Sequence, residues 1–302
     1  MNIGLVDVDS HNFPNLVLMK LSAYYKARGD KVSLLKPADV LCGSNLFEPY
    51  DKLIGACVFD WNRKTCESLE FVGVHVGGTG SGNAETLTDE IEHIMPDYSL
   101  YGITDTAYGF LTRGCPRHCP FCIVGDKEGL QSRKVANLSE WWSGQKNIKL
   151  LDPNLLACDD AIPLLRQLAD SGAWVDVTQG FDARLLTMDK IEMINAIKIR
   201  QIHFAWDNPK DESVKGALRI FARRNKLRNR QRIVYCLTNF WSTHEQDLYR
   251  VYWLRDNGYD PYIMIYDKKN APRETRLLQR WVNNKLVFWT CDRFEDFDSS
   301  IA

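Results

Sequence analysis

The sequence predicts an α/β protein in two parts, each organised around a parallel sheet. Short runs of continuously apolar residues recur along the 302-residue chain, as in strands that are buried on both faces. Segments with helical spacing of apolar residues separate most of these runs, and regular strand–helix alternation is typical of parallel sheets. The length is sufficient for two domains, or for one α/β barrel with an extension.

Residues 1–97 are predicted to form a small Rossmann-like layer. Its four expected strands cover residues 2–9, 31–35, 52–59 and 71–76. A helix is expected over residues 14–28, because proline suits a first helical turn and Gly29 suits a helix end. The glycine-rich residues 77–82 follow the fourth strand. Such glycines allow close approach of the backbone to a phosphate or a flat ligand, although the Lys-Ser/Thr end of a Walker loop is missing.

Residues 98–275 are predicted to form six β/α units in series, as in a partial (β/α)6 barrel. The expected strands cover residues 107–112, 147–152, 173–178, 199–206, 232–237 and 261–266. The expected helices cover residues 137–142, 159–169, 187–197, 212–226, 243–257 and 272–282. Thr187 is expected to cap one helix, and Thr243 with Gln246 to form a capping box on another. Residues 276–302 are expected to be an extension that ends the last helix and adds a strand at 285–289.

The composition argues against several classes of protein. A formal net charge of −1 gives no global attraction to nucleic acid or to an anionic membrane. No stretch approaches the roughly 20 apolar residues of a membrane span, and the first residues do not resemble a signal peptide. We therefore expect a cytoplasmic protein. Its nine cysteines then point to metal binding or catalysis rather than to disulfides.

Three of these cysteines directly follow the first strand of the second part. Cys115, Cys119 and Cys122 stand in a C-x3-C-x2-C spacing, with Phe121 before the last. Three thiolates can hold one compact metal centre, and a four-iron cluster normally takes four cysteines, so that one iron would stay open. The alternative is a zinc or structural site, which takes four ligands. His118 would be a strained fourth ligand, because it directly precedes Cys119.

This cysteine spacing, with the aromatic residue inside it, resembles the signature of the radical S-adenosylmethionine (radical SAM) superfamily. The resemblance is strongest over residues 96–130 and implies a partial (β/α)6 barrel. It also implies a [4Fe-4S] cluster on the three cysteines, whose open iron binds SAM, and reductive cleavage of SAM, usually to a 5′-deoxyadenosyl radical. Reduction of such a cluster implies a flavodoxin- or ferredoxin-type electron donor as partner.

Ligands of parallel α/β barrels bind at the C-terminal ends of the strands. Besides Phe121, the candidate SAM-binding residues at these ends are Asp152, Asn154, Gln179, Arg184 and Asp207. The arginine suits the SAM carboxylate through a bidentate contact, and Asp152 or Asn154 could accept from the amine. A turn cap at Asp152 and an ordinary loop residue at Asp207 are the alternatives. The Gly-Gly-Glu segment of many radical SAM enzymes is absent after the second strand.

The first part resembles the cobalamin-binding-type domain that precedes the barrel in one radical SAM class. The resemblance rests on the glycine segment, the Pro96-Asp97-Tyr98 link and Asp9-Ser10-His11, although Pro14 replaces the glycine of the related cobalamin motif. The alternative is a degenerate layer that serves as a packing platform or substrate cap. Three functions thus stay open: radical chemistry on an unknown substrate, cobalamin-dependent methyl transfer, and a non-catalytic metal-binding or regulatory protein.

Residues 217–232 carry seven lysines and arginines and no acidic residue. Such a segment is either an RNA-binding patch or the solvated face of a helix, and the sequence favours the solvated face.

Overall fold

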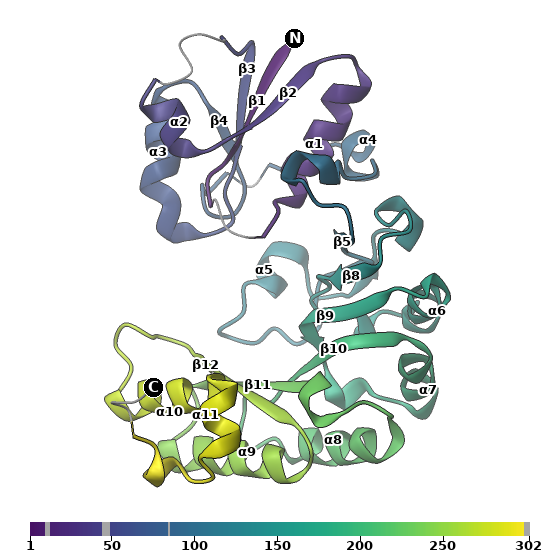
Figure 1. Cartoon of the computed structure of the whole chain (residues 1–302), viewed down its shortest axis with the longest axis vertical. Helices are drawn as coiled ribbons and strands as arrows, with labels where there is room; N and C mark the ends of the chain where they lie inside the picture. The colour runs from purple at the N-terminus through teal and green to yellow at the C-terminus, as the bar shows by residue number, and fades with distance from the viewer. Residues whose placement is uncertain (10–12, 44–48, 84, 299–302) are drawn as a thin grey trace. The chain divides into compact units, whose positions relative to one another are not determined.

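The computed structural model describes residues 1–9, 13–43, 49–83 and 85–298, which fold into two compact units (Figure 1). The first unit comprises Met1–Tyr108 and Ser139–Gln145, and the second comprises Gly109–Leu138 and Lys146–Ala302. The fold is α/β with mainly parallel sheets, as predicted. Within the described ranges, no helix has the length and apolar character needed to cross a membrane.

The first unit contains a four-stranded parallel sheet in the order β2-β1-β3-β4. The strands are β1 (Asn2–Asp7), β2 (Lys31–Leu35), β3 (Lys52–Ala56) and β4 (His75–Gly77). Alternate residues of β1 pack on opposite faces. Leu5 packs with Leu18 of a helix on one face, and Val6 packs with Leu69 of another helix on the other. Coverage on both faces explains the continuous apolar run of β1.

The helices of the first unit are α1 (Leu16–Ala27), α2 (Pro37–Leu41), α3 (Arg63–Phe71) and α4 (Asp89–Glu92). Helix α1 begins two residues after Pro14, because Asn15 Oδ1 accepts from Val17 N (3.1 Å) and Leu18 N (3.3 Å) as an N-cap. The expected start of the fourth strand at Phe71 was wrong. Phe71 is the last residue of α3 and is 92% exposed.

The sheet of the second unit has the order β12-β11-β10-β9-β8-β5, which follows the chain. Its strands are β5 (Thr106–Gly109), β8 (Asn147–Leu150), β9 (Trp174–Phe181), β10 (Lys198–Ala205), β11 (Arg232–Thr238) and β12 (Asp260–Ile265). Strand β5 joins this sheet through Gly109, whose carbonyl accepts from Leu151 N at 3.0 Å. The predicted strand over residues 107–112 was too long. The chain instead turns into β6 (Thr112–Arg113), which pairs antiparallel with β7 (Arg133–Lys134).

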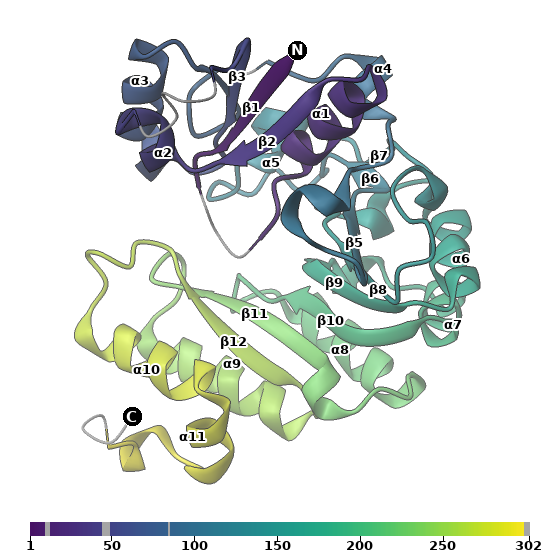
Figure 2. The ribbon, with the colours of Figure 1, turned by 45° about the horizontal axis from the view of Figure 1, so that its top comes forward.

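The main helices of the second unit cover one face of this sheet (Figures 1 and 2). They are α6 (Ala161–Ser171), α7 (Met188–Ala196), α8 (Glu212–Arg224), α9 (His244–Asp256) and α10 (Arg273–Asn283). The predicted caps are confirmed: Thr187 Oγ1 accepts from Lys190 N, and Thr243 and Gln246 form a capping box.

Two predictions near the helices of this unit were wrong. Residues 285–289 were expected to form a strand, but they belong to α11 (Lys285–Thr290), which Asn284 caps by accepting from Val287 N. The helix expected over residues 137–142 is only a single 3-10 turn, Leu138–Glu140. At residues 285–289 the short apolar sequence is compatible with a strand or a helix, and the Asn284 cap favours the helix.

Candidate metal centre and its surroundings

A short antiparallel ladder fixes the base of the cysteine loop. Strands β6 and β7 close the loop, and Cys115 N donates to Gly129 O at 3.1 Å. Glu128 accepts from Arg113 at 2.8 Å and from Gly114 N at 3.0 Å. Gly114 has φ of +88°, and a Cβ on it would lie 2.2 Å from Gln131 O. Only glycine therefore fits at the entrance to the loop.

The three thiols of the loop lie close enough to influence one another. Cys115 and Cys119 are half-buried, Cys122 is exposed, and all three are free. Cys122 N donates to Cys119 O at 2.9 Å, so the last two cysteines share a tight turn. Burial raises the pKa of the Cys119 thiol, and the charges of Asp207, Cys122 and Cys115 raise it further.

The donor set of the loop fits an iron–sulfur cluster in its chemistry. Three thiols are the ligands that such clusters take, and each would bind a different iron rather than one common ion. Among the described residues, no group of three or more His, Cys, Asp or Glu side chains is arranged to hold a single metal ion. His118, the alternative zinc ligand, adopts a left-handed conformation with φ of +44°.

Asn154, one of the predicted SAM-binding residues, follows β8 and contacts the cysteine loop. Its Nδ2 donates to Cys115 Sγ at 3.4 Å, and its backbone carbonyl accepts from Ser132 Oγ at 2.9 Å. The side chain is buried, and its Oδ1 has no hydrogen-bond partner. A buried acceptor without a partner is costly, so Oδ1 is suited to accept from a bound group.

Asp152 has a different environment from the one expected of a ligand-binding carboxylate. Its Oδ1 accepts from Leu111 N at 2.9 Å, and its Oδ2 accepts from Thr112 N at 2.6 Å and Thr112 Oγ1 at 2.5 Å. Both oxygens are thus engaged by the segment that leads into the cysteine loop. These contacts give Asp152 a structural role that differs from the expected turn cap, because the carboxylate anchors the link between β5 and β6.

The buried Asp152 carboxyl is expected to make stability depend on pH. Burial raises its pKa from 3.8 to about 7, although three hydrogen bonds from residues 111 and 112 oppose the rise. A raised pKa means that the folded state holds the proton more tightly. The contribution to stability is therefore full below pH 4 and is lost as pH rises towards 7. Asp152→Asn should flatten this fall, whose slope is at most about 1.4 kcal/mol per pH unit. Urea unfolding at several pH values measures it, and an unchanged slope in the variant would contradict the assignment.

A network of charged groups connects the cysteine loop to the end of β9. Asp182 accepts from Arg117 of the loop, and also from Arg184 Nε at 2.8 Å. Arg184 donates in addition to Asp211 at 2.9 Å. Arg184, a predicted SAM-binding residue, is thus already oriented by two carboxylates. A further anion could bind only to its remaining N–H groups. Asp182 was not predicted as a site residue, although it lies in the polar turn that drew attention to Arg184.

Removing the Asp182 carboxylate is expected to loosen the loop without unfolding the chain. Asp182→Asn keeps the shape but weakens two charge-assisted contacts, to Arg117 and Arg184, which are about twice as strong as neutral hydrogen bonds. Proteolysis by trypsin after Arg117 should therefore become severalfold faster. Asp189→Asn, a change at an exposed residue of α7, is the control. Equal cleavage rates in both variants would show that Asp182 does not hold the loop.

Two other predicted residues lie at strand ends near this network. Asp207 follows β10, and burial raises its pKa to about 6, with Arg250 and Arg184 opposing the rise. Its charge influences Cys119, so the structure brings it towards the loop. Gln179 is exposed on β9, where Gly180 follows with φ of +97°.

Aromatic side chains border the cysteine loop on one side. The Phe121 ring contacts Phe240 and Trp241, each at 5.5 Å between centroids, and Phe240 contacts Tyr266 at 4.7 Å. Phe240 and Trp241 follow β11, and Tyr266 follows β12. These contacts join residues that are far apart in the sequence, and they were not predicted. Trp241 and Tyr266 are themselves exposed, so these rings border the loop without covering it.

The glycine segment of the first unit packs against its own chain. A Cβ on Gly78 would lie 2.3 Å from Cys57 O, and one on Gly80 would lie 2.4 Å from Phe59 O. Close packing against the end of β3 therefore explains both glycines without a ligand. Asp9 accepts from Val58 N at 2.7 Å and from Asn62 Nδ2 at 2.9 Å. His11, the candidate cobalamin ligand, lies outside the described residues.

Comparisons with known proteins give no independent assignment. No model of a known protein family matches the chain, and no curated protein sequence matches it significantly. The function is therefore inferred from the residues of the site.

Proposed function

We propose that this protein is a radical SAM enzyme, in which Cys115, Cys119 and Cys122 hold a [4Fe-4S] cluster. The supporting observation is the set of three interacting thiols in one loop, beside the polar C-terminal ends of parallel strands. Ligands of α/β sheets bind at such ends. The proposal includes a partial (β/α)6 barrel for the second unit and a flavodoxin- or ferredoxin-type electron donor as partner.

When bound, the cluster would supply the electron that cleaves SAM. The chain's own residues would position the cofactor and exclude water. Asn154 donates to the Cys115 sulfur and offers its free Oδ1 to the SAM amine. Arg184 offers its remaining N–H groups to the carboxylate, and Asp207 accepts from hydroxyl or amine groups. Phe121 and its aromatic contacts would give the bound cofactor an apolar border on one side.

Anaerobic reconstitution with iron and sulfide tests this function. We expect about four irons and four sulfides per chain, the content of a [4Fe-4S] cluster, and 5′-deoxyadenosine after addition of SAM and dithionite. Bound cobalamin with formation of S-adenosylhomocysteine would instead indicate methyl transfer. One zinc per chain without turnover of SAM would refute the proposal and favour a non-catalytic metal-binding protein.

A further inference from the structure

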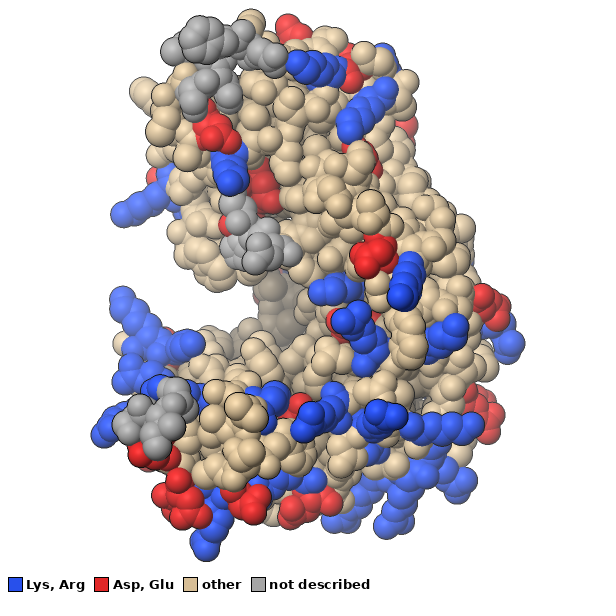
Figure 3. Space-filling model, in the orientation of Figure 1, with Lys and Arg blue, Asp and Glu red and all other residues tan. Residues whose placement is uncertain are grey.

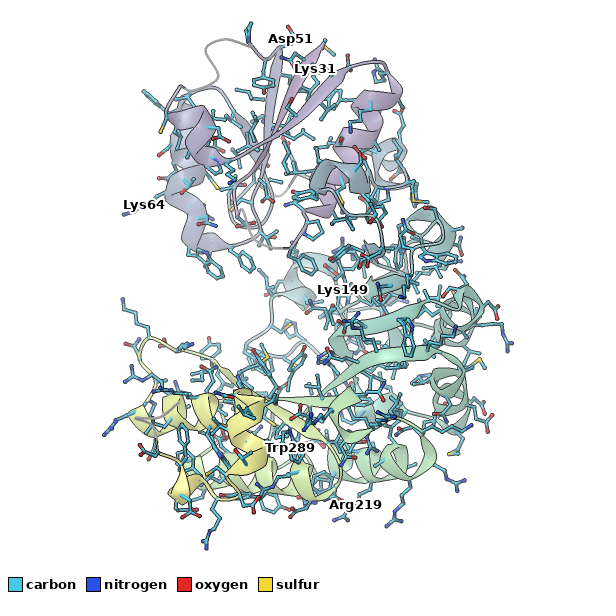
Figure 4. The ribbon with its side chains drawn as sticks, in the orientation of Figure 1. Lys31, Asp51, Lys64, Lys149, Arg219 and Trp289 are labelled. Carbon is cyan, nitrogen blue, oxygen red and sulfur yellow. The ribbon has the colours of Figure 1, made fainter. Side chains whose placement is uncertain are left out.

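The face of the second sheet opposite helices α6–α10 carries a polar cluster near the N-terminal ends of its strands. Side chains alternate between faces along a strand, and on β9 the buried Val175 and Val177 point to the helices while Trp174 and Asp176 point to the opposite face. Trp174 is 43% exposed. Lys149 of β8 pairs with Asp176 in the register, and Figure 4 labels it on that strand.

Arg200 extends across this face from the neighbouring strand. It belongs to β10, and its NH1 donates to Asn147 Oδ1 of β8 at 3.4 Å. In the register Trp174 of β9 lies between Asn147 and Lys198. The Arg200 side chain therefore passes over β9, beside Trp174 and Asp176. Arg200 and Lys198 are both exposed, and Lys198 pairs with Trp174 in the register.

A neutral histidine and a buried carboxylate oxygen without a hydrogen-bond partner lie on the same face. His203 Nδ1 is 2.7 Å from Val177 O; a carbonyl only accepts, so Nδ1 carries the proton and Nε2 has a lone pair. Burial lowers the pKa of His203 and so keeps the ring neutral. Asp176 Oδ1 is buried without a hydrogen-bond partner and is 3.8 Å from His203 Nδ1, too far to accept from it.

The cluster also has a fixed aromatic wall. The His203 ring lies flat against Tyr235, with 4.9 Å between centroids and 15° between planes. Tyr235 is held by its hydroxyl, which donates to Thr178 O at 2.9 Å, and Tyr262 meets it edge-on at 5.7 Å. These contacts fix the orientation of the His203 ring on this face.

We propose that this face binds a nucleotide unit through Trp174, Asp176 and Arg200. Each part of a nucleotide has a matching group here. The exposed indole offers a surface on which a base can stack. The unpartnered carboxylate oxygen accepts from an amino or imino N–H of the base, which removes the cost of a buried, unpaired acceptor. Arg200 and Lys198 supply the cations that a phosphate requires.

The nucleotide is either free or part of a single-stranded RNA. Only an RNA would also contact the basic surface next to this face. Asn195 at the end of α7 donates to the carbonyl of Arg224, so the basic end of α8 lies near the start of β10. Arg223, Arg224, Lys226, Arg228 and Arg230 are all exposed there. Figure 3 shows lysine and arginine side chains gathered over α8 along the lower edge of the molecule. RNA would use these charges as well, whereas a mononucleotide would not reach them.

Direct binding measurements on the full chain test the proposal. The probes are AMP, GMP, CMP and UMP, measured by calorimetry, and fluorescently labelled ten-nucleotide RNAs of A, C or U, measured by anisotropy. We expect saturable binding of at least one mononucleotide or one RNA. Trp174→Ala and Arg200→Ala should each weaken binding about tenfold or more, since stacking alone contributes about 1–3 kcal/mol per base. Asp176→Asn should weaken binding of the bases that donate at this position.

Matched variants keep these outcomes interpretable. Arg166→Ala, at an exposed arginine of α6 on the helical side, should leave binding unchanged. Trp174→Phe should retain most of it, because an aromatic ring remains for stacking. If RNA is the ligand, Arg228→Ala should also lower the dependence of binding on salt, by about 0.7 in slope for each lost phosphate contact; if a free nucleotide is the ligand, it should not.

Two results would overturn the proposal: no binding of any probe, or binding that Trp174→Ala, Asp176→Asn and Arg200→Ala leave unaltered. These assays need neither iron nor SAM, so their failure is separable from failure of the proposed radical chemistry.

Discussion

Replacing Cys119 by alanine is expected to abolish both cluster formation and SAM cleavage. The proposed cluster has only three protein ligands, so the variant would keep two thiols in the loop. Iron and sulfide content after anaerobic reconstitution should fall from about four per chain to near background. Production of 5′-deoxyadenosine should fall by at least a hundredfold, which corresponds to about 2.7 kcal/mol in the barrier. The visible absorbance of the cluster and the yield of 5′-deoxyadenosine are the measurements.

Cys291→Ala is the matched control for this experiment. Cys291 is also free and half-buried, and it lies outside the loop in the same unit. Its removal should leave iron content and SAM cleavage unchanged. A Cys119→Ala variant that keeps the cluster colour would remove the basis for the ligand assignment. Equal losses in both variants would indicate unfolding rather than loss of a ligand, and circular dichroism spectra would show it.

Most of the fold could be predicted because buried parallel strands leave a local signature. Strand β2 was predicted at its observed bounds, and the caps at Thr187 and Thr243 were predicted from residue type and spacing alone. The errors occur where local signals are ambiguous. Phe71 is the last residue of α3 and lies just before β4, and its exposure is not that of a buried strand residue. Residues 285–289 are apolar enough for a strand, but Asn284 caps a helix there.

The candidate site was predictable only in the parts that are close in sequence. The cysteine spacing is a local pattern, so the loop could be identified at once. The contact of Asn154 with Cys115 spans 39 residues, and it was anticipated only through the rule that strand ends converge. The engagement of Asp152 by residues 111 and 112 could not be predicted, because it depends on the turn from β5 to β6. The proximity of Asp176 to His203 likewise depends on the register of β9 and β10.

A buried arginine supports the strand ends on which the candidate site depends. The Arg250 side chain of α9 is fully buried, and it donates to Leu237 O at 2.7 Å and to Asp207 O at 2.9 Å. It also donates to Trp206 O and to the buried Asp247 carboxylate. One guanidinium therefore binds backbone carbonyls at the C-terminal ends of the neighbouring strands β10 and β11. It thereby fixes the backbone of Asp207, a candidate SAM-binding residue.

Arg250→Met is expected to destabilise the second unit by about 3–5 kcal/mol, because it leaves a buried carboxylate without its cation. The freed carbonyls of Trp206 and Leu237 would add to this cost, since methionine fills the space but donates nothing. Arg223→Met, at an exposed arginine of α8, should change the free energy of unfolding by no more than about 0.5 kcal/mol. The double variant Arg250→Met/Asp247→Leu should recover part of the loss, because it removes the unpaired charge as well. Urea unfolding followed by tryptophan fluorescence measures all three. A loss below 1 kcal/mol in Arg250→Met would mean that water or a rearranged side chain replaces the guanidinium, and that Asp207 is held in place by other contacts.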